Sequence, residues 1–269
     1  MALLCSVFFF SASDIIKKTK NSRMKKSVLK ISILLMGILL AIPSCDDNNG
    51  RSLGDIYISI ATVVPEGDNA YSFLLDNGKR LWPAAGNVRY TPTYNQRVFL
   101  NYTILWDSPG TTYDYDIKVN DIWNILTKQA IELNAENQDS IGNDPVRIQD
   151  IWVGGDYLNV SFLFNYGGVK PHLVNLAENT LSEETSPGAI DLEFRHNAYE
   201  STQTKLYEGF VCFDLKPFRN DDADAVNLSI KVKGWNGEKT YDLIYRYNQP
   251  AAEKTARTLT PVISSNEYY

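Results

Sequence analysis

The chain has 269 residues, of which 44% are apolar and 22% charged, and its formal net charge at neutral pH is −6. Seven of its 26 Lys and Arg residues and one of its 32 acidic residues precede Cys45, so the remainder carries 19 basic against 31 acidic side chains and a net charge of −12. Binding to nucleic acid or to anionic lipid needs clustered Lys and Arg. The composition therefore argues against both classes and leaves a basic partner possible.

Residues 24–44 have the features of an export signal. Met24 begins the basic segment MKKSVLK, and an apolar run follows over residues 31–42. A basic start, about 12 apolar residues and a small-residue exit are typical of a secretory signal. A membrane-spanning helix would need about 20 apolar residues. The block before Met24 holds a second apolar patch, MALLCSVFFFSA, which is best explained if translation begins at Met24 and residues 1–23 are a mis-called leader.

Cys45 follows the residues Ile-Pro-Ser at the end of this signal. The arrangement resembles a bacterial lipobox, in which the thiol receives a diacylglycerol, the signal is removed and the new amino terminus is acylated. An ordinary secretory peptide that contains a cysteine is the alternative. Buried acyl chains contribute about 0.8 kcal/mol per CH2, so two or three of them hold a protein on a bilayer. We therefore expect the mature protein to lack residues 1–44 and to be anchored to a membrane through Cys45 without crossing it.

The mature chain keeps one further cysteine, Cys212, so we expect an exported protein without an internal disulfide. Its core must then be large enough to hold the fold without a covalent link. Cys212 lies in the alternating segment GFVCFDL and is expected to pack as a small apolar side chain. The length after Cys45 suits two domains of about 100 residues each.

Alternation of apolar and polar residues, the signature of half-buried strands, dominates the mature chain. Its first part predicts five strands, including a hairpin whose Asn77-Gly78 turn supplies the positive φ that a tight turn needs. In the strand before the next hairpin, alternate residues up to Trp106 are expected to face the core. Five strands in about 70 residues predict a small closed OB-like barrel over residues 55–124, since closure removes exposed sheet edges.

The second part of the chain predicts a different β architecture. Residues 125–146 lose the alternation and are expected to form a linker with a short helical or irregular stretch. The alternation resumes over residues 147–248 in roughly seven strands with turn signals between them, which predicts a β-sandwich. Residues 45–54 are expected to be an anchored linker and residues 249–269 a mobile tail. The predicted fold class is all-β, a five-stranded OB-like barrel followed by a roughly seven-stranded sandwich.

The string DLEFRHNAYE is the one place where chemistry-bearing residues gather, with Arg195, His196 and Asn197 side by side. His196 shares strand parity with Phe194 and ends an apolar row. We therefore expect a buried histidine that is hydrogen-bonded to backbone at a sheet corner. A ligand contact through His196 is the alternative, and catalysis has the least support.

No metal, cofactor or catalytic residue is expected. Zinc sites need spaced Cys and His ligands, which the chain lacks. The acidic run NDDADAVN has neither the glycine nor the terminal glutamate of a calcium-binding loop, and a solvated turn is the better interpretation. The sequence contains no G-x-S-x-G nucleophile elbow and no glycine-rich phosphate loop. We therefore expect that the protein is not an enzyme.

All five tryptophans lie in the mature chain, and exposed aromatic rings are a common means of binding sugars. Trp82 and Trp235 lie beside predicted turns and are the candidates for contact with a glycan. Trp106 follows the buried parity of its strand and is expected in the core.

Four strings, FLLDNGKRLWP, DYDIKVNDIWNILTK, IWVGGDYLNVSF and LEFRHNAYE, resemble the NigD-like lipoproteins of Bacteroides-type bacteria. The resemblance spans the lipobox and both predicted domains, and it implies an N-terminal OB-like barrel and a C-terminal β-sandwich. The family is named for a proposed role in bacteriocin immunity that rests on gene neighbourhood, and it has no established catalytic residues. In such bacteria an acid-rich stretch after the lipidated cysteine is a surface-export signal. Asp46 and Asp47 therefore imply a lipid-anchored outer-membrane protein that faces outward.

Two functions are consistent with these observations. The first is an envelope protein that acts by binding, such as an immunity factor that captures a toxin or masks its receptor. The alternative is a surface glycan-binding module. The expected partners are the membrane, through the lipid on Cys45, and an unidentified protein or glycan, but no nucleic acid.

Overall fold

The structure is a computed structural model that describes most of the chain from residue 52 to its end. The described residues are 52–67, 70–167, 170–181, 186–202, 205–247, 249–250 and 267–269. The predicted leader, the lipidation site Cys45 and the export signal Asp46 and Asp47 lie outside them. Helix is confined to α2 (Gln138–Ile141) and the 3-10 turn η1 (Lys216–Phe218) within the described part. No helix of this part is long and apolar enough to span a bilayer.

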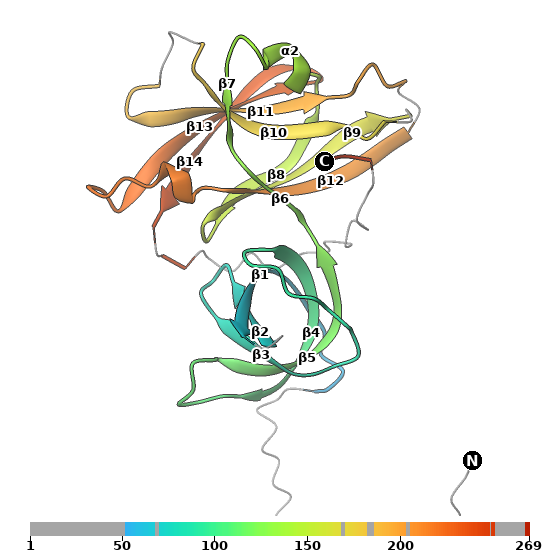
Figure 1. Ribbon diagram of the computed structural model, residues 1–269, viewed down its shortest axis with the longest axis vertical. Helices are drawn as coiled ribbons and strands as arrows, with labels where there is room; N and C mark the ends of the chain where they lie inside the picture. The colour runs from blue at the N-terminus through green and yellow to red at the C-terminus, as the bar shows by residue number, and fades with distance from the viewer. Residues whose placement is uncertain are drawn as a thin grey trace, which may run out of the picture. The chain divides into compact units, whose positions relative to one another are not determined.

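Five strands form a closed barrel in the order β1-β2-β3-β5-β4 (Figure 1). β1 pairs antiparallel with both β2 and β4, and β3 pairs parallel with β5, so each of the five strands has two neighbours. Closure of this kind removes the exposed edges of an open sheet. The predicted five-stranded barrel is confirmed. Its strands are β1 (Tyr57–Gly67), β2 (Ala70–Leu75), β3 (Arg80–Gly86), β4 (Arg97–Asp107) and β5 (Tyr115–Asn124).

Alternate residues of these strands point into the barrel and fill its core. Trp106 was predicted to be one of them, and this prediction was wrong. Its side chain is 55% exposed. Ile104 pairs with Ile117 and Trp106 pairs with the next residue of β5, so Leu105 is an extra residue without a partner. Such a β-bulge shifts the alternation by one position and turns the following side chain to the other face of the sheet. Trp106 therefore points outward.

The remaining strands form a sandwich of two sheets, in the orders β14-β13-β11-β10-β7 and β6-β12-β9-β8 (Figure 1). Seven of these strands lie within residues 147–248, as predicted. Phenylalanine, valine and leucine side chains from both sheets make the core between them. The seven strands are β8 (Arg147–Gly154), β9 (Tyr157–Tyr166), β10 (Leu173–Asn179), β11 (Ala189–Asn197), β12 (Lys205–Asp214), β13 (Ala225–Gly234) and β14 (Gly237–Arg246).

The other two strands come from residues 125–146, so the predicted linker is in fact part of the sandwich. β6 (Leu126–Gln129) pairs parallel with β12, and β7 (Ile131–Leu133) pairs parallel with β10, which adds one edge strand to each sheet. Edge strands are often short and polar, because one side of them faces solvent. They therefore lack the alternation by which longer strands are recognised. The predicted short helical stretch in this segment corresponds to α2.

The tail predicted to be mobile over residues 249–269 is ordered at its end. The backbone N–H of His172 donates to the carbonyl of Glu267 at 2.6 Å. The Tyr268 hydroxyl accepts from the N–H of Phe210 and donates to its carbonyl, both at 2.8 Å. These bonds attach the last residues to both sheets. The residues between position 250 and Glu267 lie outside the described part of the chain.

A buried polar cluster joins the barrel to the sandwich. Arg97, at the start of β4, is 1% exposed and forms an ion pair with Asp76 at 2.7 Å. Its guanidinium also donates to Thr62 at 2.9 Å and to Asn159 of β9 at 3.3 Å. The Cys212 thiol is fully buried and donates to the Asn159 side-chain oxygen at 3.0 Å, and burial raises its pKa to about 11. The predicted burial of Cys212 is confirmed.

Candidate functional site

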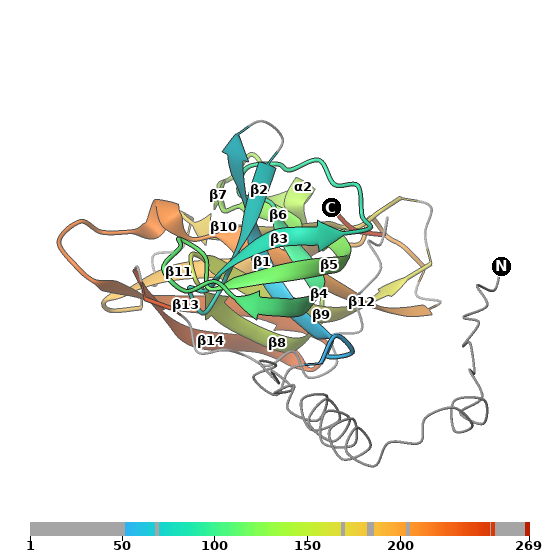
Figure 2. The ribbon, with the colours of Figure 1, turned by 90° about the horizontal axis from the view of Figure 1, so that it is seen from below.

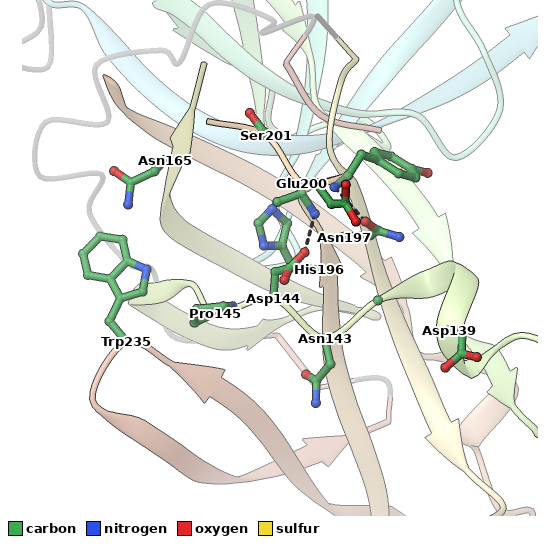
Figure 3. A pocket seen from close by; sticks show the side chains of 13 residues that line it. Asp139, Asn143, Asp144, Pro145, Asn165, His196, Asn197, Glu200, Ser201 and Trp235 are labelled. Carbon is green, nitrogen blue, oxygen red and sulfur yellow. Dashed lines mark hydrogen bonds between the residues drawn. The ribbon is translucent and has the colours of Figure 1, made fainter. Parts of the chain in front are cut away.

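A pocket of about 660 Å3 lies among the loops of the sandwich (Figure 3). It is lined by α2 and the loop that follows it, by the ends of β9 and β11, by the loop after β11 and by the β13–β14 turn. None of the described residues that line it is Lys or Arg. The lining includes three carboxylates and three amides, which are Asp139, Asp144, Glu200, Asn143, Asn165 and Asn197.

The loop after α2 is held tightly against β11. Gly142 follows α2 with a φ of 68°, and a Cβ at this position would lie 2.6 Å from that of Asn197. Arg195 Nε donates to the Gly142 carbonyl at 2.7 Å, and Asn197 Nδ2 donates to the Ser140 carbonyl at 2.8 Å. The last carbonyls of a helix have no partner within the helix, and these side chains supply one. Arg195 and Asn197 therefore serve to position the pocket wall.

Asp144 connects the same loop to the end of β11. Its backbone N–H donates to the carbonyl of His196 at 2.7 Å. Its carboxylate accepts from the N–H of Ala198, also at 2.7 Å (Figure 3). Backbone and side chain thus fix this carboxylate at the wall of the pocket.

The loop after β11 carries unusual backbone geometry. Tyr199 and Glu200 have φ values of 49° and 57°, a region that side-chain-bearing residues rarely occupy. Each such residue costs on the order of 1 kcal/mol, and residues of this kind cluster at binding and catalytic sites. The Tyr199 N–H donates to the Asn197 side chain at 2.8 Å, and its hydroxyl lies 2.6 Å from that of Tyr269. These bonds hold the strained turn, which presents Glu200 to the pocket.

Two histidines meet under the pocket. Nδ1 of His172 lies 2.9 Å from Nε2 of His196, and both side chains are almost completely buried. Among the described residues, Nε2 of His172 has no hydrogen-bond partner. Burial and the neighbouring His172 lower the pKa of His196 to about 4, and burial also lowers the pKa of His172. Both rings are therefore neutral at pH 7.

The backbone of Asp144 acts on the His196 side chain as a hydrogen-bond partner, as expected, and the ring also bonds to His172. The burial that the strand parity predicted is confirmed. His196 also lines the pocket, so its predicted role as a ligand contact stays a prediction.

The structure separates the two tryptophan candidates. Trp235 lines the same pocket as His196 and is 39% exposed, with the guanidinium carbon of Arg147 5.2 Å from its ring centre. Trp82 lies on the barrel instead, where its ring centre is 5.0 Å from that of Tyr113. The two residues therefore cannot form one binding site within the sandwich pocket.

Among the described residues, the lining of the pocket does not pair a nucleophile with a base. Its histidine is bonded to another histidine, whereas a nucleophile mechanism needs a base next to a hydroxyl or thiol. The Ser201 hydroxyl, which also lines the pocket, accepts instead from the N–H of Gly167 at 3.2 Å. Within the described ranges, no three His, Cys, Asp or Glu side chains converge as a metal site. The lining offers negative charge and hydrogen-bond acceptors, which suit a cationic ligand.

Most of this lining was missed by reasoning from the sequence. Asp144 and Glu200 lie in loops, where alternation carries no information. The left-handed turn at Tyr199 and Glu200 has no glycine to mark it. The one usable signal was the density of Asn, Asp and Glu after the apolar row that ends at His196.

Comparisons with known protein families cover both parts of the described chain. The NigD-like N-terminal OB domain matches residues 60–125, and the NigD-like C-terminal beta sandwich domain matches residues 129–245. Together the two matches cover more than half of the sequence. No curated protein matches the chain.

Solved structures agree with these matches. A protein designated toxin-related, from Parabacteroides distasonis, is 41% identical, covers 72% of this chain and 95% of its own, and has a TM-score of 0.64. A protein of unknown function from Bacteroides vulgatus is 32% identical, with coverages of 77% and 97% and a TM-score of 0.66. A NigD-like immunity protein from Bacteroides caccae, 18% identical with coverages of 71% and 96% and a TM-score of 0.54, shares the fold.

Proposed function

The chain belongs to the NigD-like family, and we propose that it is a lipid-anchored envelope protein that binds a basic polypeptide, in the manner of an immunity protein. The observation that carries this proposal is the charge of the sandwich pocket. Asp139, Asp144 and Glu200 line it, and no described lining residue is basic. The immunity designation of one solved relative supports the same function.

An acidic concavity favours a basic ligand because of its charge. Carboxylates along a low-dielectric wall attract Lys and Arg side chains over several ångströms and accelerate their encounter with the pocket. The net charge of −12 after Cys45 extends the attraction beyond the pocket itself.

The proposed location rests on the amino-terminal sequence. The signal over residues 24–44 and its final cysteine, Cys45, support lipidation, and the following Asp46 and Asp47 support display on the outer membrane. An anchored protein with an acidic pocket would meet basic polypeptides as they reach the cell. Binding without catalysis is part of the proposal, and the pairing of His196 with His172 supports it.

The test is a calorimetric titration of the detergent-solubilised full chain with a synthetic peptide of alternating arginine and glycine. We expect the affinity to fall when salt rises from about 50 mM to about 300 mM, because salt screens exposed charges. We expect the variant D139N/E200Q to bind at least about tenfold more weakly, a loss of about 1.4 kcal/mol.

The matched control is D221N/D222N, which removes the same charge from an exposed turn outside the pocket. It should retain the affinity of the unmodified chain to within about twofold. An affinity that does not change with salt concentration would contradict the proposal. Equal losses of affinity in D139N/E200Q and D221N/D222N would also contradict it.

A further inference from the structure

The barrel carries an aromatic surface of its own on the outer face of β3, β5 and β4, which are neighbours in the sheet (Figure 2). Trp82 of β3 and Trp106 of β4 both pair with Asp116 of β5. Residues in register on neighbouring strands point to the same face, so the two indoles flank this carboxylate. Two strand spacings separate their backbones, about 10 Å.

Two β-bulges shape this row. The extra residue Leu105 turns Trp106 outward, and a second register shift in β3, between Pro83 and Ala85, directly follows Trp82. Bulges are frequent beside functional sites, where they redirect a side chain. The indole N–H of Trp106 donates to the Asp116 carboxylate, which fixes the ring although more than half of it is exposed. The chain thus holds a large apolar ring in water where a regular strand would have buried it.

Hydrogen-bonding groups surround the two rings. Asn120 lies on the same face of β5 as Asp116, and its amide donates to Asn101 at 3.2 Å and to Thr103 at 3.1 Å on β4. Lys118 lies between Asp116 and Asn120 on this face, so its charge offsets that of the carboxylate. Further charged residues of both signs lie on or beside this face. Arg80 is two residues before Trp82 on β3, Asp121 pairs with Asn101 of β4, and Glu66 is hydrogen-bonded to Tyr113.

Further aromatic surface adjoins Trp82. The Tyr113 ring packs against it at 5.0 Å between ring centres. A hollow of about 250 Å3 lies beside Trp82 and is also lined by Pro83 and Val88. The face therefore combines flat rings, a shallow recess and polar groups whose charges nearly balance.

We propose that this face binds a neutral saccharide chain. Indole rings stack on the apolar C–H faces of pyranose rings, and the amides, hydroxyls and Asp116 match their hydroxyl groups. Charges of both signs nearly balance on this face, on a chain that is otherwise strongly acidic, which fits an uncharged ligand. Nucleic acid also stacks on aromatic rings, but its phosphates need clustered cations, and Arg80 and Lys118 are offset here by Asp116, Asp121 and Glu66.

The test uses the detergent-solubilised full chain and a panel of neutral hexasaccharides, namely xylo-, manno-, cello-, malto- and chitohexaose. Tryptophan fluorescence should change on titration with at least one of them. We expect Trp106→Ala and Trp82→Ala each to weaken that binding about tenfold, and Trp106→Phe to retain most of it because a ring remains. Both positions lie outside the barrel core, and a thermal melt of each variant checks that it is folded.

Two controls localise the site. Tyr94→Ala removes a ring that is 74% exposed elsewhere on the barrel, and Trp235→Ala removes the exposed ring of the sandwich pocket. Both should bind within about twofold of the unmodified chain. The inference is overturned if no hexasaccharide binds, or if binding survives the loss of Trp106 and Trp82. The inference is also overturned, in favour of nucleic acid, if an oligothymidylate of twelve nucleotides binds to the unmodified chain and this binding is lost in Trp106→Ala. Because this face is separate from the acidic pocket, the two proposals fail independently.

Discussion

The two buried polar clusters of the chain differ in charge. At the junction of barrel and sandwich, both terminal nitrogens of Arg97 have partners, and Asp76 balances the charge, while Nε of Arg97 has no partner among the described residues. Under the sandwich pocket, His172 and His196 share one hydrogen bond. The first cluster is a charged brace between domains, whereas the second is a neutral pair beside a pocket.

This difference predicts which kind of change should destabilise the protein through each cluster. A buried ion pair depends on both members, since the loss of one leaves an uncompensated charge. A neutral histidine pair depends on pH, since protonation would place a charge in a buried site where the cost of desolvation exceeds the attraction of Asp144. Mutation should therefore expose the role of the Arg97 cluster, and acid that of the histidine pair.

The largest expected effect is on the Arg97 cluster. Asp76→Ala should lower the free energy of unfolding by about 3 to 5 kcal/mol, because it leaves the Arg97 charge buried and unpaired. Replacing both residues, as Asp76→Ala with Arg97→Met, should recover part of the loss. Urea unfolding followed by fluorescence measures both values.

The control for this prediction is Lys231→Ala, which breaks the exposed ion pair between Lys231 and Glu238 at 3.6 Å. Exposed pairs contribute little, and we expect a change below about 1 kcal/mol. Equal losses of unfolding free energy in Asp76→Ala and Lys231→Ala would show that the Arg97 cluster does not stabilise the protein more than an exposed ion pair does.

The histidine pair should make stability fall in acid. The folded-state pKa of His196, about 4, is lower than its ordinary value of 6.5, so the unfolded chain takes up a proton first as pH falls. Stability should be unaffected by this group above about pH 7 and should decline between pH 6.5 and 4, by about 3 kcal/mol in total. The lowered pKa of His172 acts in the same direction.

Urea unfolding at a series of pH values measures this decline. Carboxylates also titrate near pH 4, so the informative quantity is the difference between the unmodified chain and His196→Gln. The variant should lose stability less steeply over the window. Parallel curves for the two proteins would mean that the pair does not titrate as described.

A smaller effect of opposite sign is expected at the strained turn. Glu200→Gly should raise the free energy of unfolding by about 1 kcal/mol, because glycine adopts the positive φ of 57° without a steric cost. It should also weaken binding of the arginine peptide. Glu200→Ala is the matched control, since it removes the carboxylate but keeps the strain. A Glu200→Gly protein that is no more stable than Glu200→Ala would contradict the presence of strain.

The smallest effect is expected at Trp106. Its exposed ring fills no cavity, so Trp106→Ala should change stability by no more than about 0.5 kcal/mol. Leu100→Ala, a fully buried position of the same strand, should cost about 2 to 5 kcal/mol. Thermal unfolding compares the two variants, and a large loss at Trp106 would indicate that it supports the barrel after all.

The alternation of apolar and polar residues predicted most of the fold. The turn at Asn77-Gly78 was expected from sequence, and Gly78 does have a positive φ, of 84°. Short edge strands such as β6 escaped notice because a strand with one solvated side needs little apolar character. The bulge at Leu105 escaped as well, since one extra residue has no signature in the sequence, and with it the exposure of Trp106.

The candidate site was less predictable than the fold, because it depends on contacts between distant segments. Parity placed His196 on a buried face, but its contact with His172 results from the pairing of β10 with β11. Asp144 reaches the pocket only because the loop after α2 is tied to the end of β11. Such contacts follow from sheet register and loop geometry, which composition and periodicity do not encode.

The central claim, that the acidic pocket binds a basic polypeptide, is tested most directly by cross-linking on intact cells. A photoreactive phenylalanine analogue would replace Trp235 at the pocket rim and, in a control strain, Tyr94 on the barrel. We expect an adduct from position 235 with a polypeptide rich in Lys and Arg, lost in the D139N/E200Q background, and no such adduct from position 94. Equal labelling from both positions, or an adduct with an acidic protein that survives D139N/E200Q, would contradict this claim.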